Sequence, residues 1–233
     1  MKILGIVGSP RKAEESGVHA LVETALKATG FDYELVHLRG KTIGGCIACL
    51  GCVKDNVCKV QDDLAPLREK VVGAAAYVIG SPNYYSGLNV LTHAFLERWY
   101  QYRHQEGDTL WGKLGVAIGV GGSSGHFCTA EIEKFFLYNF VETVAKVDGQ
   151  GAASCFSCGY GETCAVGVPR LLFGENVRIT EAVIPRVTKR PEVMAAAEAA
   201  GRELGRRLRE GHDRKEVAAR MQAALMAKFK EST

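Results

Sequence analysis

Four cysteines gather in one short stretch of the chain, and their spacing is the first feature with chemical meaning. They are Cys46, Cys49, Cys52 and Cys58, in the pattern Cys-x2-Cys-x2-Cys-x5-Cys. Because the first three recur at every third residue, a tight turn can direct their thiols toward one point. Glycines before and within the run leave the backbone free to wrap closely. A [4Fe-4S] cluster needs one thiolate for each of its irons, so residues 44–60 are predicted to form an iron-sulfur loop.

Zinc and disulfides are the alternatives for this run. Zinc sites usually pair two Cys-x2-Cys knuckles about a dozen or more residues apart, whereas here three cysteines occupy seven positions. Disulfides are disfavoured because nothing in the sequence points to an oxidising compartment. The bacterial ferredoxin run has a gap of x3 and a following Pro, whereas this run has x5 and is followed by Lys59. The similarity to ferredoxin is therefore one of chemistry.

A second group of cysteines repeats part of this pattern further along the chain. Cys155, Cys158 and Cys164 keep the x2 and x5 gaps but lack one thiol. Cys128 is a candidate fourth ligand, because loops that follow adjacent strands share an edge of a sheet. A second cluster or a metal is one interpretation of these four residues. A redox-active dithiol and free loop thiols are the others.

Length and composition restrict the class of protein. The chain has 233 residues, 47% of them hydrophobic, which suits one domain with an extension. The formal net charge of +3 arises from 29 basic and 26 acidic residues, which is too balanced for a nucleic-acid surface. No apolar stretch has the length of a membrane helix or a signal peptide core. We therefore expect a cytoplasmic protein with no nucleic-acid or membrane partner.

The first strand leads into a candidate phosphate-binding loop. Residues 2–7 are apolar, and Gly8-Ser9-Pro10-Arg11-Lys12 follows just before a helical pattern. Backbone N–H groups and the positive end of the helix attract an anion there, and Ser9, Ser16 and Arg11 or Lys12 would complete a phosphate cradle. The loop lacks Gly-x-Gly-x-x-Gly and the nucleoside triphosphatase signature. An ordinary turn with solvated charges is the alternative.

Strands and helices alternate through residue 150. Further strands are expected at 33–38, 74–80, 114–120 and 143–147, with helices at 62–72, 89–103 and 129–141. This alternation predicts a doubly wound α/β fold with a parallel sheet. Two more loops then reach the edge where ligands sit: the polar and aromatic stretch 81–87 and the glycine-rich stretch 121–126. Tyr84 or Tyr85 could cover a flat ring there, with Asn83 reading its edge.

The chain divides into three expected segments. Residues 1–150 form the sheet domain, including cysteine loop 44–60. Residues 151–190 form an irregular, cysteine-containing insertion with prolines as breakers. Residues 191–233 form a helical extension, with helices at 191–209 and beyond residue 213, that is expected to serve in oligomerisation.

Three motifs together resemble the NADPH-dependent FMN reductase group of flavodoxin-like proteins. They are Gly8-Ser9-Pro10-Arg11-Lys12 with Ser16, Gly80-Ser81-Pro82-x-Tyr84, and Phe95-Leu96-x-Arg98. With the compact cysteine run followed by Asp62-Asp63, the chain more narrowly resembles the iron-sulfur flavoprotein family. The resemblance covers roughly residues 1–150. It implies a flavodoxin-like, doubly wound, five-stranded parallel sheet that binds FMN.

The resemblance also implies roles for individual residues. The FMN phosphate would contact Ser9, Arg11, Lys12 and Ser16; the isoalloxazine would border Pro82, Asn83, Tyr84, Tyr85 and Ser86, with Gly121, Gly122 and Ser123 nearby; and Cys46, Cys49, Cys52 and Cys58 would each bind one iron of a [4Fe-4S] cluster. Family members are homodimers or homotetramers in which the flavin and the cluster of neighbouring subunits approach each other.

The expected function is that of an FMN- and iron-sulfur-dependent oxidoreductase. It would relay electrons between a two-electron donor or acceptor and a one-electron partner, with NAD(P)H or a redox protein such as ferredoxin as partner. No side-chain general base is predicted, because the cofactors carry the chemistry. A cluster-free NAD(P)H-dependent FMN or quinone reductase is one alternative. A non-enzymatic electron-transfer or redox-sensing flavoprotein is another.

Overall fold

Five strands with buried apolar residues pair in parallel to form the central sheet. The computed structural model describes residues 1–105 and 107–231, and the strand order is β2-β1-β3-β5-β6. The strands are β1 (Lys2–Val7), β2 (Asp32–His37), β3 (Ala76–Tyr84), β5 (Leu114–Gly121) and β6 (Glu142–Gln150). A sixth, short strand, β4 (Gly87–Leu88), pairs antiparallel with the end of β3. This order is that of a flavodoxin-like doubly wound sheet, so the predicted fold class is confirmed.

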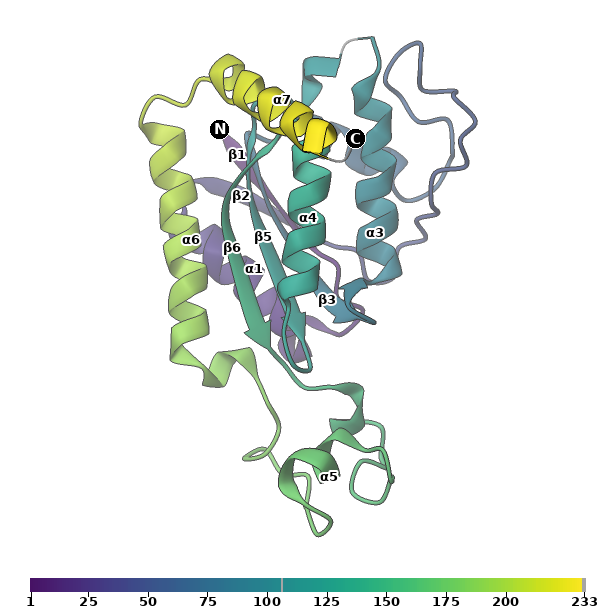
Figure 1. Cartoon of the computed structure of the whole chain (residues 1–233), viewed down its shortest axis with the longest axis vertical. Helices are drawn as coiled ribbons and strands as arrows, with labels where there is room; N and C mark the ends of the chain where they lie inside the picture. Colours follow the sequence, from purple (N-terminus) through teal and green to yellow (C-terminus); the bar gives the residue numbers. More distant parts are fainter. Residues whose placement is uncertain (106, 232–233) are drawn as a thin grey trace.

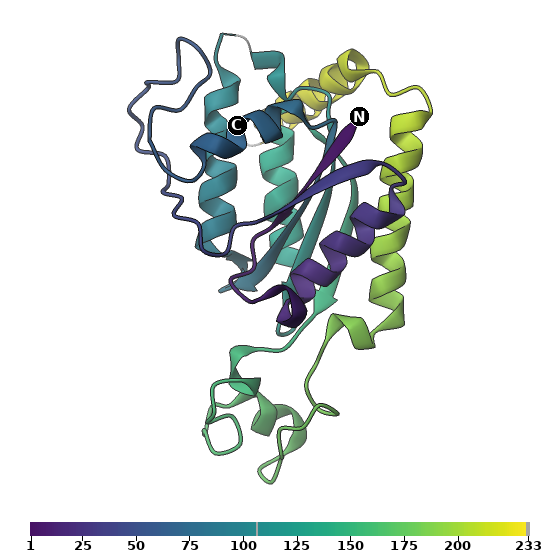
Figure 2. The same cartoon turned by 180° about the vertical axis from the view of Figure 1, so that it is seen from behind.

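Successive side chains of each strand point to opposite faces of the sheet, and the apolar ones form a layer on each face. Ile3 and Val7 of β1 face the helices α1 (Gly17–Ala28) and α6 (Pro191–Arg209), which cover one face of the sheet (Figure 2). Leu4 and Ile6 face the opposite layer. That layer contains α2 (Arg68–Gly73), α3 (Val90–Glu97) and α4 (His126–Tyr138) (Figure 1). Helices on both faces leave the two ends of the sheet open for ligands.

The segment beyond residue 190 contributes to this core. Ala197, Ala200 and Leu204 of α6 are buried with side chains of α1. The last helix, α7 (Arg214–Glu231), contacts α4 and β6, and Glu142 of β6 pairs with an arginine from each of the two C-terminal helices. The core therefore extends past residue 150 and includes α6. The expected role of residues 191–233 in oligomerisation stays a prediction.

Several element boundaries differ from the expected ones. The α-helix expected at 62–72 begins only at Arg68, after the 3₁₀ turn Ala65–Leu67, and the Asp62 carboxylate pairs with Arg98. The loop expected at 81–87 is largely strand, since β3 continues to Tyr84 and turns back into β4. The helix expected at 129 begins at His126.

Short helical turns complete the chain. The 3₁₀ helices are η1 (Ala13–Glu15), η2 (Ala65–Leu67), η3 (Arg98–Arg103), η4 (Gly107–Thr109), η5 (Ser154–Phe156) and η6 (Val187–Lys189). None of the helices that the structure describes has the length and apolar character needed to cross a membrane.

Residues 151–190 form a lobe that projects beyond the carboxyl end of the sheet (Figure 1). It leaves from the end of β6 and returns into α6, and its one α-helix is α5 (Val168–Phe173). Few of its side chains are buried; Phe156, Val177 and Val187 are the apolar ones. The segment was expected to be irregular, and α5 is the regular element that the sequence analysis missed.

Because α6 packs closely on the end of α1, we expect two glycines to differ in how well they tolerate an added methyl group. A Cβ on Gly205 would lie 2.1 Å from the backbone oxygen of Thr29, whereas a Cβ on Gly73 of α2 would meet nothing within 4 Å. We expect Gly205→Ala to lower the free energy of unfolding by about 1–3 kcal/mol. Gly73→Ala should leave it unchanged or raise it by up to about 1 kcal/mol. Urea unfolding followed by circular dichroism measures both, and equal effects would contradict this packing.

Candidate functional site

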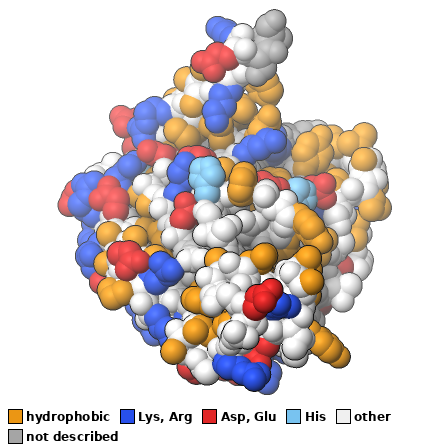
Figure 3. Space-filling view, turned by 60° about the horizontal axis from the view of Figure 1, so that its bottom comes forward, with side chains coloured by type: hydrophobic (Ala, Val, Ile, Leu, Met, Phe, Trp, Pro, Cys, Tyr) orange, Lys and Arg blue, Asp and Glu red, His pale blue; other side chains and the backbone are white. Residues whose placement is uncertain are grey.

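A cavity of about 590 Å³ opens at the carboxyl end of the sheet, in the volume range of small-molecule sites. Its walls come from the loop after β1, the end of β3, the loop after β5, and both ends of the lobe. Figure 3 brings this end of the molecule forward, where basic, acidic and apolar side chains are interspersed on the surface. The loop after β1, the stretch at the end of β3 and the loop after β5 therefore converge as predicted, and the lobe adds a fourth wall.

The loop after β1 is tied firmly to the sheet and to α3. The Gly8 N–H donates to the Gly80 oxygen at 2.8 Å, and Asn89 Nδ2 donates to the Gly8 oxygen at 2.7 Å. A Cβ on Gly8 would lie 1.8 Å from Thr92 Oγ1, so only glycine allows this approach. The position of the loop is thus set by a neighbouring strand and by the N-terminus of α3.

Two buried hydroxyls line the cavity at this loop. Ser9 and Ser16 are each 3% exposed. Ser9 Oγ accepts from the Arg11 N–H at 3.2 Å, and Ser16 Oγ caps α1 by accepting from the His19 N–H at 3.1 Å. Each oxygen is thus held by a backbone donor, and each hydroxyl keeps a proton that it can donate to an anion. The start of α1 adds the positive end of its dipole.

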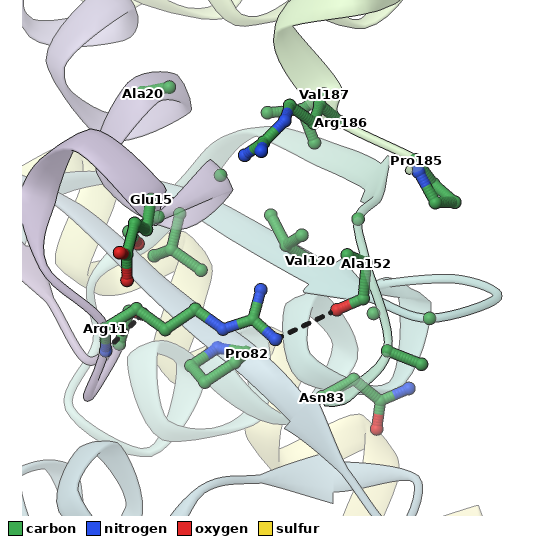
Figure 4. A pocket seen from close by; sticks show the side chains of 18 of the residues that line it. Arg11, Glu15, Ala20, Pro82, Asn83, Val120, Ala152, Pro185, Arg186 and Val187 are labelled. Atoms are coloured by element: carbon green, nitrogen blue, oxygen red, sulfur yellow. Dashed lines mark hydrogen bonds between the residues drawn. The ribbon is translucent and has the colours of Figure 1, made fainter. Parts of the chain in front are cut away.

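Two arginines reach into the same cavity from opposite sides (Figure 4). Arg11 spans it, and its Nη2 donates to the Ala152 oxygen at 3.1 Å. Arg186 enters from the returning end of the lobe and pairs with Glu181 at 3.0 Å and 2.7 Å. Hydrogen bonding with Glu181 raises the pKa of Arg186, so its guanidinium stays charged. The cavity therefore contains two cations beside two hydroxyl donors.

The end of β3 forms the next wall as a tight hairpin. Its two-residue turn, Tyr85 and Ser86, has φ of +51° and +61°, a left-handed conformation that usually favours Asn or Gly. Asn83 lines the cavity and donates from Nδ2 to the Ser124 oxygen at 2.8 Å. Its Oδ1 is buried without a partner in the described part of the chain. It is an acceptor available to an N–H group of a ligand.

The structure brings together most of the residues predicted to bind FMN. Eight of them line the cavity: Ser9, Arg11, Ser16, Pro82, Asn83, Tyr84, Gly121 and Gly122. The other four, Lys12, Tyr85, Ser86 and Ser123, are exposed and lie outside its lining. Tyr85 and Ser86 form the hairpin turn, so the backbone directs their side chains away from the wall that Pro82 and Asn83 build.

The lobe supplies cavity residues that the sequence analysis missed. Ala152, Ala153 and Ser154 line the cavity where the chain leaves β6, and Glu181 and Arg186 line it where the chain returns. Nothing in the local sequence marks these positions as ligand contacts. The only available signal was their place after the last strand, whose carboxyl end had to reach the ligand edge of the sheet.

The cysteine loop forms a second, much smaller cavity beside α3. All four predicted thiols, those of Cys46, Cys49, Cys52 and Cys58, line this space of about 20 Å³ together with Arg98. Ala48, Leu50 and Asn56 have positive φ, which costs roughly 1–2 kcal/mol each and lets the loop curl around its own centre. The loop of residues 44–60 thus folds back on itself, with its four cysteines beside one small space.

Side chains from α3 and η3 hold this loop by its backbone. Glu97 accepts from the Cys46 N–H at 2.7 Å, and Gln101 accepts from the Cys58 N–H at 3.0 Å. His104 Nε2 lies 3.2 Å from Cys52 Sγ. One short helical segment therefore contacts three of the four cysteines.

A buried ion pair closes the base of the loop. Arg98 is 2% exposed and donates from Nη1 to Asp62 Oδ2 at 2.8 Å and to the Gly44 oxygen at 3.0 Å. Burial alone would raise the pKa of Asp62, but hydrogen bonds from Arg98, Gly44 and Leu64 outweigh it and lower that pKa. Arg98 Nε has no partner among the described residues. This cation lies beside the thiol of Cys58 and can offset negative charge there.

The donor set suits an iron-sulfur cluster chemically, although the loop must open to accept one. Burial raises the pKa of Cys52, and the nearby Cys58, Cys46 and Cys49 raise it further. Thiolates this close repel one another unless a metal compensates their charge. Within the described residues, no three His, Cys, Asp or Glu side chains already surround a point where a metal ion could bind. Cys46 and Cys49 lie on an exposed stretch, which leaves the loop room to move outward.

The second cysteine group is divided by the fold. Cys155, Cys158 and Cys164 lie in one turn of the lobe and are partly or fully exposed. Cys128 is fully buried in α4 and donates from Sγ to the Gly87 oxygen at 3.3 Å. Burial raises the pKa of Cys128 to about 12. A neutral thiol used in a core hydrogen bond is a poor metal ligand, so the structure does not support Cys128 as a partner of the other three.

The strand order, with the cavity at the carboxyl ends of the strands, defines a protein of the flavodoxin-like class. Residues 1–154 match the NADPH-dependent FMN reductase family, and the chain belongs to that family.

Curated relatives of the chain are named iron-sulfur flavoproteins. An iron-sulfur flavoprotein of Archaeoglobus fulgidus is 35% identical over 123 residues, which cover 52% of this chain and 54% of the relative. An iron-sulfur flavoprotein of Methanocaldococcus jannaschii is 32% identical over 154 residues, covering 64% of this chain and 78% of the relative. The match to the first thus spans about half of its length.

Solved structures share the fold. RosB with a bound 8-demethyl-8-formylriboflavin-5′-phosphate intermediate superposes with a TM-score of 0.61 at 18% identity, covering 97% of this chain and 87% of RosB. A flavone reductase superposes with a TM-score of 0.55 at 17% identity, covering 90% of this chain and 64% of its own. At these identities the comparison shows a common architecture.

The buried ion pair predicts that the cysteine loop depends on Arg98. Removing its charge leaves the Asp62 carboxylate with only the Gly44 and Leu64 N–H groups as partners, and breaking a largely buried ion pair typically costs about 3–5 kcal/mol of stability. We expect Arg98→Met to lower the free energy of unfolding by this amount and to speed alkylation of Cys58. Arg39→Met, at an exposed arginine just before the loop, should change stability by less than about 0.5 kcal/mol. Unchanged alkylation in Arg98→Met, measured by mass spectrometry, would contradict this role.

Proposed function

We propose that this protein binds FMN in the large cavity and an iron-sulfur cluster in the cysteine loop, and that it transfers electrons between them. The observation that carries the proposal is the cavity itself. It combines two buried hydroxyls, two arginines and a helix N-terminus at one end with the Pro82–Tyr84 wall beyond them. These groups suit a phosphate and a flat, hydrogen-bonding ring, respectively.

The loop after β1 and the lobe would bind the phosphate. Ser9 and Ser16 donate their hydroxyl protons, and Arg11 supplies charge once its guanidinium leaves the Ala152 oxygen. Arg186 lines the same cavity and adds a second cation from the lobe (Figure 4). The phosphate thereby bridges two parts of the chain that are far apart in sequence.

The ring end of the cavity is built by the β3–β4 hairpin and the loop after β5. Asn83 offers its free Oδ1 to a ring N–H group. The backbone of Gly121 and Gly122 lines the cavity without side chains, so a ligand can approach it closely. Tyr84 is half-exposed at the rim, where its ring can cover one face of the ligand. No ionisable side chain is needed as a general base.

The cysteine loop would hold a [4Fe-4S] cluster through Cys46, Cys49, Cys52 and Cys58. FMN exchanges two electrons with a hydride donor, and a cluster accepts one electron at a time. NAD(P)H or a redox protein such as ferredoxin would be the electron partner. The relatives named iron-sulfur flavoproteins and the four thiols that line one cavity support this part of the proposal.

The two sites lie at opposite ends of α3. Asn89 caps its first turn beside the phosphate loop, and Glu97 holds the cysteine loop at its last residue. The intervening helix is about 12 Å long at 1.5 Å per residue. We therefore propose that a homodimer or homotetramer brings the cluster of one subunit close to the flavin of its neighbour.

Loss of either arginine should weaken flavin binding. A charge-assisted hydrogen bond contributes roughly 1.5–3 kcal/mol, so Arg11→Gln and Arg186→Gln should each raise the Kd for FMN about 10- to 100-fold. Lys12→Gln is the matched control, because Lys12 is exposed outside the cavity lining, and its Kd should change less than about threefold. Quenching of FMN fluorescence measures all three, and an equal response to Lys12→Gln would contradict the assignment.

Anaerobic purification with flavin and iron analysis tests the whole proposal. The wild-type chain should contain one FMN and about four irons for the first site. Cys46→Ser should lose that iron while keeping FMN, because Cys46 lines the small cavity of the cysteine loop and not the large cavity. Turnover with one electron donor in a screen of NADH, NADPH and reduced ferredoxin would then define the reaction.

A cluster-free FMN or quinone reductase remains the second candidate function, favoured by the family match itself. It predicts bound FMN and turnover with NAD(P)H without any iron or dithionite-bleachable absorbance beyond the flavin bands. Flavin and iron without turnover by any donor would indicate an electron-transfer or sensing protein instead.

A further inference from the structure

The turn that contains Cys155, Cys158 and Cys164 has no part in the proposed flavin chemistry, and its backbone has the form of a metal knuckle. Gly159 follows the second cysteine with φ of +83°, a conformation that favours glycine. The Tyr160 N–H then points back and donates to Cys158 Sγ at 3.4 Å. A backbone N–H directed at a cysteine sulfur can orient that sulfur toward a bound metal.

The rest of the turn brings the Gly161 backbone against Cys155, while the three thiols do not surround a common point among the described residues. A Cβ on Gly161 would lie 2.1 Å from the Cys155 oxygen, so only glycine lets the chain pass this closely. The Cys164 N–H donates to the Tyr160 oxygen at 2.9 Å, and Gly167 packs against Cys164. The segment 155–164 is therefore one compact turn that carries all three thiols, and none of them is in a disulfide.

An independent observation is that the lobe lacks the apolar core that would hold it together. Its large apolar side chains are mainly on the surface: Tyr160, Val166, Leu171, Leu172 and Phe173 are each at least half-exposed or close to it. The regular elements within residues 151–190 are short: the α-helix α5 and the 3₁₀ helices η5 and η6. Small units without a sufficient core are usually held by disulfides or by a metal, and the lobe has no disulfide.

We propose that Cys155, Cys158 and Cys164 form a second metal centre, in which three thiolates bind a thiophilic metal and one coordination position stays open. The three side chains rotate toward a common point when the metal binds, and each thiol releases its proton to solvent. Zn²⁺ and the iron of a cluster share this preference for sulfur, and they are distinguished by analysis. Cys128 takes no part, because its thiol is buried in a core hydrogen bond.

Such a centre would hold the lobe in one conformation and thereby fix the position of the cavity wall that the lobe supplies. Ala153 and Ser154 line that cavity immediately before Cys155, and Glu181 and Arg186 line it on the return of the lobe. The metal site itself is independent of the flavin and of the first cysteine loop, so it can be tested whether or not FMN and a cluster bind as proposed.

Metal content of the full chain tests the site directly. Zinc and iron per chain are measured in a Cys46→Ser, Cys49→Ser variant, which removes the first loop as a source of metal. We expect about one zinc, or a cluster's complement of iron, to remain. Adding Cys158→Ser or Cys164→Ser should remove at least nine-tenths of it. Ser157→Ala, at the exposed neighbour of Cys158, is the matched control and should retain it.

Two further readouts separate metal binding from misfolding. In the Cys46→Ser, Cys49→Ser variant, Co²⁺ should give thiolate charge-transfer absorbance that the further change Cys158→Ser loses and Cys128→Ala keeps. Chelator treatment should speed proteolysis within residues 151–190 at least about tenfold, while the far-ultraviolet circular dichroism of the sheet domain stays the same. Equal metal content with and without Cys158 and Cys164 would overturn the proposal. Loss of metal in Cys128→Ala with an unchanged circular dichroism spectrum would overturn the three-thiolate assignment.

Discussion

The ion pair between Arg98 and Asp62 is the interaction on which the arrangement of the two sites most depends. Arg98 ends α3 and, besides Asp62, binds the Gly44 and Val60 oxygens, so it connects both ends of the cysteine loop to the helix. The charges are removed from water, which makes the pair costly to break and fixes its geometry. At the other end of α3, Asn89 binds the Gly8 oxygen of the phosphate loop. One helix therefore sets the position of both loops relative to the sheet.

The lobe has a comparable influence on the large cavity at the carboxyl end of the sheet. Arg11 reaches across to Ala152, and Val187 packs on Gly17, where a Cβ would lie 3.0 Å from its side chain. Both connections to the lobe thus touch the start of α1 or the loop before it. A change in the lobe is transmitted to the phosphate end of the cavity through these two contacts.

Local motifs explain why much of the fold and site could be predicted. The phosphate loop and the cysteine run each place their functional side chains within a few residues, so spacing alone relates them. Arg186 was missed because it joins Ser9 and Arg11 only through the path of the lobe. The hairpin was missed because Tyr85 and Ser86 adopt a left-handed turn without the expected Asn or Gly. Asp62 stands where the helix at 62–72 was expected to begin, and only the fold shows that its carboxylate pairs with a residue far along the chain.

The attachment of the lobe at the edge of the sheet has an evolutionary consequence. Residues 151–190 leave and re-enter between β6 and α6, while the five-stranded register and both helical layers are formed by other residues. Insertions, deletions or a new fold in this segment would therefore leave the scaffold intact and replace one wall of the ligand cavity. The family match ends at residue 154, close to the start of the lobe. The residues of the lobe that line the cavity, among them Ala153 and Arg186, can then change while the pairing of the five strands stays the same.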